Sequence, residues 1–151
     1  MKIVLAADPF ALSLKNAIVA HLKKEGHEIL DYGASEGKEI PYYESAVAAC
    51  RAMQKGEATR GILICGTGMG MSMIANRFKG VRAAVVESVF AAKMCRAIND
   101  ANVLCLGGMI WGDWMANEAV DVFLKTNLAD GLEDLAGFLN QAAKIVDAIK
   151  D

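Results

Sequence analysis

The sequence predicts a doubly wound α/β domain, in which a parallel sheet is covered by helices on both faces. Short apolar runs and amphipathic segments alternate five times along the chain. The apolar runs are continuous rather than interrupted by polar residues, which is typical of strands that are buried on both faces. A length of 151 residues suits one core and is too short for two ordinary domains, so we expect residues 1–151 to form a single domain.

The first strand and helix open the chain. The apolar run at 2–7 predicts a strand, and apolar residues then recur at helical spacing over 10–26. Lysines fill the last turn of this helix, and Gly26 is its stop signal. Asp8 stands where a helix N-cap is expected, and Pro9 where the first helical residue is expected. Asp8 therefore lies at the end of the first strand.

The rest of the chain continues this alternation and ends in two helices. The second strand is expected at 27–33, and a polar loop at 33–41 leads to a helix that runs from 42 to about 56. The same periodicities predict strands at 60–66, 81–87 and 101–108. They predict helices at 70–78, 88–100, 113–126 and 132–151.

In an open parallel sheet, ligands bind beyond the carboxyl ends of the strands, close to the point where the strand order reverses. We therefore expect the chemistry among residues at strand ends. The candidates are Asp8, Cys65 with the loop after it, Glu87 with Ser88, and the region 99–108.

Composition and charge argue against several classes of function. The formal net charge is −2 and the lysines are scattered, so we expect no nucleic acid partner. We expect no membrane association, and the N-terminal apolar run is too short for a signal peptide. These features favour a cytoplasmic protein with reduced cysteines. The cysteines form no C-x-x-C pair, and neither His21 nor His27 has a cysteine at ligand spacing, so we expect no metal site.

The stretch "GILICGTGMGM" at 61–71 is the strongest functional signal. Glycines at 66, 68 and 70 let backbone N–H groups turn toward one point just before a helix, which is typical of an anion site. A dinucleotide-binding loop is one alternative, with Glu87 as the ribose-binding acid, although the third glycine stands one place early. A P-loop is excluded because no Gly-Lys-Ser/Thr follows. A glycine turn without any ligand is a further alternative.

Cys65 ends the strand that leads into this loop. Nearby N–H dipoles stabilise a thiolate, so we expect Cys65 to ionise readily and to act as a base. The same N–H groups are suited to hold the oxyanion that forms when a proton leaves a carbon next to a carbonyl. A buried, unreactive thiol is the alternative, and we keep that interpretation for Cys50, Cys95 and Cys105, which fall inside helices or a strand.

From residue 1 to about residue 125, the sequence resembles the family of ribose-5-phosphate isomerase B and galactose-6-phosphate isomerase. The resemblance rests on Asp8 after the first strand and on the stretches "PYYESAVA", "GILICGTGMGMSMIANRFKGVRAAVV" and "NDANVLCLGG". It implies a three-layer αβα Rossmann-like fold and a homodimer or dimer of dimers. The active sites would lie across the dimer interface, where we also expect the C-terminal helix.

The resemblance also implies an activity, the interconversion of an aldose and a ketose through a 1,2-enediolate. The substrate would be a small sugar or sugar phosphate, with no metal or organic cofactor. Cys65 matches the base that moves the proton between C1 and C2, and Thr67 matches a residue that assists the substrate hydroxyls. The other positions that match substrate-binding residues are Asp8, Tyr43, Gly66, Gly68, Met69, Gly70 and Asn99.

The sequence departs from this family where the sugar ring is opened and where phosphate is held. Pro9 and Ile98 stand at positions where the family has histidines. Met109, Leu132 and Ala136 stand where it has arginines. A phosphate dianion needs charge-assisted donors, so these replacements should weaken phosphate binding and argue against ordinary ribose-5-phosphate activity.

Two hypotheses remain. In the first, the protein isomerises a substrate that needs no ring opening, such as a four-carbon ketose phosphate or another short-chain sugar. Its anion contact then comes from Arg77, Lys79, Arg82 or a partner subunit, although basic residues near a helix end are commonly solvated. In the second, the protein is a non-catalytic sugar-binding relative or one subunit of a heteromeric isomerase. The intact Cys65 favours the first hypothesis, and the missing arginines favour the second.

Overall fold

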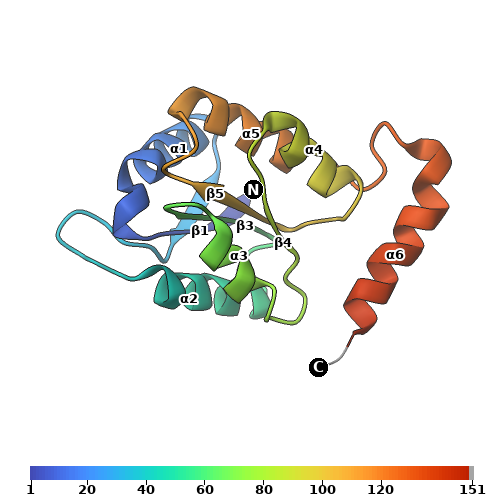
Figure 1. The fold of residues 1–151 in the computed structure, drawn as a ribbon, viewed down its shortest axis with the longest axis horizontal. Coiled ribbons are helices and arrows are strands. Elements are labelled where there is room, and N and C mark those ends of the chain that lie inside the picture. Colours follow the sequence, from blue (N-terminus) through green and yellow to red (C-terminus); the bar gives the residue numbers. More distant parts are fainter. Residues whose placement is uncertain (150–151) are drawn as a thin grey trace.

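Five parallel strands form a sheet in the order β2-β1-β3-β5-β4 (Figure 1). A computed structural model of the chain describes residues 1–149. The strands are β1 (Lys2–Ala7), β2 (Glu28–Asp31), β3 (Arg60–Cys65), β4 (Ala83–Val85) and β5 (Val103–Gly107). Every neighbouring pair is parallel. The predicted α/β class and five-stranded parallel sheet are confirmed.

Helices cover both faces of the sheet, which gives three layers and confirms the Rossmann-like arrangement. The helices are α1 (Leu12–Lys24), α2 (Tyr42–Gln54), α3 (Met69–Ala75), α4 (Val89–Ala97), α5 (Asp113–Lys125) and α6 (Ala136–Ala148). Figure 1 shows α1, α4 and α5 on one face and α2 and α3 on the other. Short 3-10 turns, η1 (Pro9–Ala11) and η2 (Glu133–Leu135), precede α1 and α6. Within residues 1–149, no helix combines the length and apolar character needed to span a bilayer.

Most predicted element ends agree with the structure to within a few residues. The last helix was expected at 132–151, and residues 150 and 151 of that range lie outside the described residues. β4 is three residues long, shorter than expected. The N–H of Arg82 donates to the side-chain amide of Asn102 at 2.8 Å in place of a backbone partner on β5, so the strand begins only at Ala83. On the free edge of the strand, the N–H of Ala83 donates to the side-chain amide of Asn76 at 2.8 Å. Asp8 holds the predicted N-cap position, but its side chain makes no capping hydrogen bond and a 3-10 turn follows it.

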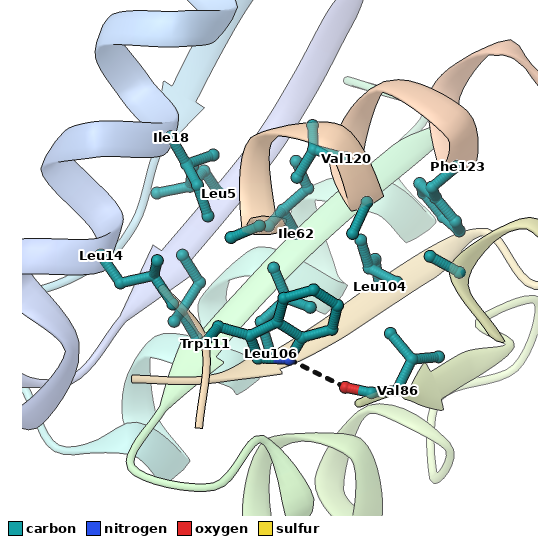
Figure 2. Close-up of a cluster of buried hydrophobic side chains, with 14 of the residues drawn as sticks. Leu5, Leu14, Ile18, Ile62, Val86, Leu104, Leu106, Trp111, Val120 and Phe123 are labelled. Carbon is teal, nitrogen blue, oxygen red and sulfur yellow. Dashed lines mark hydrogen bonds between the residues drawn. The ribbon is translucent and has the colours of Figure 1, made fainter. Parts of the chain in front are cut away.

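The core consists of two apolar clusters, one on each face of the sheet. Figure 2 shows the cluster beneath α1 and α5, where Leu5, Ile62 and Leu104 from three neighbouring strands meet Ile18 and Phe123. All five side chains are fully buried. Burial of each such side chain stabilises the fold by about 1.5–3 kcal/mol. This packing holds the strands that carry the candidate site.

Trp111 anchors the segment after β5 in the same cluster. Its indole N–H donates to the carbonyl oxygen of Val86 at 3.0 Å (Figure 2). Because Val86 directly follows β4, this bond fixes the chain ends of two strands relative to each other. The Trp111 side chain is buried, as expected for a core aromatic residue.

The strand order reverses between β1 and β3, because the chain leaves β1 toward β2 on one side and returns to β3 on the other. Ala7 pairs with Ile64 near the ends of these strands. On the next strand, Gly107 pairs with Cys65. The carboxyl ends of β1, β3 and β5 therefore lie side by side at the switch point, where ligands bind in folds of this class.

Helix α6 stands apart from the three layers (Figure 1). An ion pair of 2.7 Å between Arg82 and Asp147 ties it to the segment before β4. Several large apolar side chains of α6 are solvent-exposed in the single chain, among them Phe138, Ile145 and Val146. An exposed apolar face of this kind is typical of a helix that packs against another molecule.

Candidate active site

Asp8 and Cys65 end neighbouring strands at the switch point. The N–H of Asp8 donates to the carbonyl oxygen of Ile64 at 3.2 Å, which continues the β1–β3 pairing beyond the strand. Side chains alternate between the two faces of a sheet, and Ala6 and Cys65 both belong to the cluster under α2 and α3. Asp8 follows Ala6 by two residues and so projects toward that same face. The structure thus brings together the expected base and a residue expected to hold the sugar.

The sulfur of Cys65 lies against the glycine loop 66–70. The N–H of Gly68 donates to Sγ at 3.1 Å, and a donor in this position stabilises negative charge on sulfur. Cys65 itself is 5% exposed. Thr67 is exposed at the tip of the loop, where its hydroxyl oxygen accepts a long hydrogen bond of 3.4 Å from the N–H of Met69.

The first turn of α3 leaves two backbone donors open. Gly68 is the N-cap of this helix, and the first helical bond runs from the N–H of Ser72 to the carbonyl oxygen of Gly68. The N–H groups of Gly70 and Met71 donate to no acceptor within the part of the chain that the structure describes. Open N–H groups at a helix start favour an anion or a developing oxyanion. The geometry therefore matches the anion site that the glycine spacing predicts.

Two glycines after β5 keep the neighbouring loops in backbone contact. A Cβ atom added at Gly107 would lie 2.8 Å from the Cα of Thr67. One added at Gly108 would lie 3.1 Å from the Cα of Ala11. A contact of 2.8 Å to backbone is closer than real Cβ atoms come, so only glycine fits at Gly107, whereas at Gly108 a side chain would require Ala11 to shift by a few tenths of an ångström. The loops after β1, β3 and β5 therefore form one packed unit.

Tyr42, rather than Tyr43, contacts the glycine loop. A Cβ atom added at Gly70 would lie 2.7 Å from Cε2 of Tyr42, so the ring packs directly on this glycine. Tyr43 lies edge-on to Tyr42, with 5.4 Å between the ring centroids, and lines a separate hollow beside Ile74. The two tyrosines are consecutive in α2 and point about 100° apart, so only the rotation of the helix decides which one faces the loop. The sequence contains no signal that singles out Tyr42.

The carboxyl group of Asp8 is buried without a full set of partners. The residue is 6% exposed, and its Oδ1 has no hydrogen-bond partner among residues 1–149. Burial raises the pKa of Asp8, and the backbone N–H groups of Phe10 and Ala11 lower it in part. Buried polar atoms in native proteins are normally paired, so an unpaired carboxyl oxygen at a crevice is suited to bind a ligand hydroxyl.

The loops around Cys65 carry almost no positive charge. The segments that follow β1, β3, β4 and β5 contain no lysine or arginine; they are 8–11, 66–70, 86–88 and 108–112. Met109 packs over the glycine loop, since its Cε would lie 3.4 Å from a Cβ at Gly66. Met69, also expected in the site, is half exposed. In this part of the chain a phosphate would meet backbone donors and apolar side chains, with no charged donor beside Met109.

Asn99 lies at the opposite edge of the sheet. It belongs to the loop that precedes β5, whereas Cys65 lies beside Gly107 at the end of β5. At 3.3 Å per residue, the strand alone separates the two positions by about 13 Å. The expectation that the whole region 99–108 lies at the carboxyl edge is therefore wrong, because only Gly107 and Gly108 reach that edge. Within one chain, Asn99 does not join Cys65.

Asn99 instead lines a groove of about 630 Å³ between the amino edge of the sheet and α6. Arg77 and Lys79 line the same groove. Arg82 also lines it, but the Asp100 carboxylate already accepts from its guanidinium at 2.7 Å, as does Asp147. The basic residues expected to contact an anion are thus grouped with Asn99 and not with Cys65.

The three other cysteines are buried inside helices or a strand, as expected. Burial raises the pKa of Cys50 and of Cys95 to about 11. Complete burial likewise raises the pKa of Cys105. These thiols therefore stay protonated at neutral pH. Cys65 is the one cysteine of the described chain that stands at the switch point.

Known proteins are similar to this chain in sequence and in fold. The sequence profile of the family described as Ribose/Galactose Isomerase matches residues 3–135. The 4-deoxy-4-sulfo-D-erythrose isomerase of Clostridium sp. (strain MSTE9) is 42% identical over 153 residues, which cover 100% of this chain and 96% of that protein. The ribose-5-phosphate isomerase B of Escherichia coli is 42% identical over 132 residues, which cover 86% of this chain and 87% of that protein.

Among solved structures, a ribose 5-phosphate isomerase from Thermotoga maritima matches with a TM-score of 0.88 at 34% identity. The match covers 98% of this chain and 98% of that chain. The similarity therefore extends beyond the three layers to α6, the helix that stands apart.

Proposed function

We propose that this chain, which belongs to the ribose/galactose isomerase family and is an aldose–ketose isomerase, moves the substrate proton with Cys65 through a 1,2-enediolate. The observation that carries this proposal is the hydrogen bond of 3.1 Å from the Gly68 N–H to the Cys65 sulfur, beside the open N–H groups of Gly70 and Met71. A stabilised thiolate and an adjacent oxyanion site are what proton transfer next to a carbonyl requires.

The chemistry balances without an added reactant. The Cys65 thiolate takes the proton from C2 of the aldose, the electron pair of that bond forms the C1–C2 double bond, and the carbonyl electrons move to O1. The resulting enediolate oxygen is held by the N–H groups of Gly70 and Met71. The cysteine returns its proton to C1 while the hydroxyl proton moves from O2 to O1, which leaves the carbonyl at C2. Thr67 and Asp8 hydrogen-bond the sugar oxygens during this exchange.

The substrate that best fits this site is an open-chain four-carbon sugar with a terminal anionic group. Such a sugar cannot close the usual ring through its terminal oxygen, so a ring-opening acid–base residue is not needed at Pro9 or Ile98. The Clostridium relative, similar over the whole of this chain, is named as an isomerase of a four-carbon sugar with a terminal sulfonate. A sulfonate carries one negative charge where a phosphate carries about two, which suits a site with few charged donors.

The complete site is formed by two copies of the chain. Asn99, Arg77 and Lys79 lie together at the amino edge, and the Cys65 crevice at the carboxyl edge lacks basic residues. In a homodimer each chain therefore supplies the groove residues to the crevice of the other, by an isologous contact. Complementary charge supports this pairing, since Asp8 and Glu87 mark one edge and Arg77 and Lys79 the other.

The exposed apolar face of α6 supports the same assembly. Helix α6 has few contacts with its own three layers and presents Phe138, Ile145 and Val146. Packing this face against the partner removes a large apolar surface from water and stabilises the dimer. We also place the enzyme in the cytoplasm, because Cys65 acts only as a free thiol and cytosolic thiols stay reduced.

A heteromeric enzyme is the second candidate. Met109 covers Gly66 and no arginine lies in the adjoining loops, which favours a partner chain that brings the charged donors. In that case the purified chain alone would bind sugar weakly and turn nothing over. Addition of the partner chain would restore activity.

A substrate panel tests the proposal directly. Purified wild type is assayed with three- to six-carbon aldoses and ketoses that carry no charge, a terminal phosphate or a terminal sulfonate. We expect turnover of a four-carbon anionic sugar and incorporation of solvent deuterium at C1 or C2 during partial conversion. Turnover confined to five- and six-carbon sugars would contradict the chain-length assignment, and no turnover at all would support the heteromer.

A further inference from the structure

Lys15 is a buried charge in α1. Its side chain is 3% exposed, and its ammonium group lies 2.6 Å from Oδ2 of Asp31 at the end of β2. The same ammonium donates to the carbonyl oxygen of Ala34. Desolvation of a lysine is costly, and an apolar pair of similar volume is often at least as stable as a buried ion pair. Stability alone therefore does not account for Lys15.

The groups that bind Lys15 belong to a segment that is hydrogen-bonded to Ala7, the residue before Asp8. The Oδ1 of Asp31 accepts from the N–H of Gly33 at 2.9 Å. The N–H of Ala34 donates to the carbonyl oxygen of Ala7 at 2.8 Å. A Cβ atom added at Gly33 would lie 2.3 Å from the nitrogen of Ala7, so this segment is pressed directly against the residue before Asp8.

Lys15 also fixes the chain on the other side of Asp8. It belongs to α1, which begins just after the 3-10 turn that follows Asp8. One ammonium group therefore joins the start of α1 to the segment packed on the end of β1. Oδ1 of Asp8 has no hydrogen-bond partner, and the N–H groups that act on the carboxyl belong to Phe10 and Ala11 in the turn before α1. The backbone on these two sides therefore positions the Asp8 carboxyl.

We propose that Lys15 is a positioning residue of the isomerase, which acts through Asp31 and the Gly33–Ala34 backbone to hold Asp8 at the crevice. This inference rests on the proposed function, in which Asp8 binds a substrate hydroxyl. A small displacement of such a group lowers the rate without removing any reacting atom. Lys15 touches neither the substrate nor Cys65 in this scheme.

The kinetic test compares Lys15→Met and Asp31→Asn with Lys24→Met, a matched control at the exposed end of the same helix. We expect Lys15→Met to lower kcat/KM about ten- to a hundredfold, mainly through kcat, and the control to have no effect. In an Asp8→Asn background, Lys15→Met should lower kcat/KM less than about twofold, because the effects of coupled residues are not additive. A merely structural lysine would instead lower activity by the same factor in both backgrounds.

Amide hydrogen exchange provides a readout that does not depend on turnover. Asp31→Asn removes a charge without loss of volume and leaves the buried Lys15 ammonium without its carboxylate, so the whole fold loses stability. The N–H of Ala34 should nevertheless exchange faster relative to the most protected core amides of the same variant, and in Lys24→Met it should not. Unchanged protection of Ala34 would overturn the inference. So would equal losses of activity in the two backgrounds, or full activity of Asp8→Asn. If wild type turns over no sugar, the proposed function fails while the exchange measurement still decides whether Lys15 holds this segment.

Discussion

The Cys65 sulfur accepts a hydrogen bond from the Gly68 backbone, with 3.1 Å between Sγ and the nitrogen. The two residues are three positions apart, so the chain folds back on itself directly after β3. This bond connects a strand end to the start of α3 and puts the thiol next to the open N–H groups of the helix.

Cys65→Ala is expected to abolish isomerisation and to leave the fold intact. The substitution removes the proton carrier but only one small side-chain atom at a strand end, so the free energy of unfolding should change by about 1 kcal/mol. Steady-state kinetics and thermal unfolding measure the two effects. Cys95→Ala, at a buried cysteine inside α4, is the matched control and should keep full activity. Residual turnover near the wild-type rate would exclude Cys65 as the base.

Gly68→Ala is expected to lower both stability and activity. Gly68 has a φ of +79°, and an added Cβ would lie 3.0 Å from the carbonyl carbon of Leu106. We expect the free energy of unfolding to fall by about 2–3 kcal/mol, and kcat to fall because the Cys65 contact is displaced.

Gly26, after the end of α1, offers a control for the backbone effect alone. Its φ is +78°, but an added Cβ meets no atom within 4 Å. Gly26→Ala should therefore lower the free energy of unfolding only by the strain of the left-handed conformation, about 1–2 kcal/mol, and should keep normal activity. Equal losses of activity in the two variants would show that activity does not depend on the contact of Gly68 with Cys65.

Asp8→Asn is expected to be more stable than wild type at neutral pH and less active. Burial raises the folded-state pKa of Asp8 above its unfolded value, so the ionised carboxylate costs stability at about pH 7. As the pH falls through the folded pKa, wild type binds a proton and regains stability. The difference in free energy of unfolding between Asp8→Asn and wild type should thus become smaller as the pH falls. It should vanish below the unfolded-state pKa of the carboxyl, about 3.9.

Urea unfolding across this pH range measures that difference. Asp134→Asn, at an exposed carboxyl, is the control and should show no such narrowing. If the stability advantage of Asp8→Asn over wild type instead grew toward low pH, the ionised carboxylate would stabilise the fold, contrary to the effect expected from its burial.

Mixed dimers test the two-copy site. Cys65→Ala and Asn99→Ala chains should each be nearly inactive alone, the first for lack of a base and the second for lack of a substrate contact. If the crevice of one chain is completed by Asn99 of the other, co-refolding in equal amounts should restore about a quarter of the wild-type sites. If the mixture is no more active than the separate variants, either both residues belong to the site of the same chain or Asn99 belongs to no active site.

The fold and the candidate site around Cys65 could be predicted because their signals are local. Each strand and helix has its own periodicity, and Cys65 with its glycines lies within eleven consecutive residues. Relations between distant segments were harder to predict. Whether Tyr42 or Tyr43 faces Gly70 depends on the rotation of α2 about its axis, and that rotation is set by packing.

The error at Asn99 has a different cause. Strand direction alone decides which edge of a parallel sheet a loop occupies, and Asn99 precedes β5 while Gly108 follows it. The parallel arrangement was predicted, so the two positions could have been assigned to opposite edges from the sequence. The proposed site, in which Asn99 of one chain joins Cys65 of another, depends on a contact between chains, and the periodicity of a single chain contains no signal for such a contact.

Gly107 and Gly108 also constrain how an enzyme of this design can evolve. Both glycines are in backbone contact with neighbouring loops, so a side chain at Gly107 would displace the segment that carries Thr67, and one at Gly108 would press on the segment that carries Ala11. Mutations that change the preferred sugar must therefore accumulate in side chains at the rim, such as Met109, while the spacing of the reacting groups is inherited unchanged.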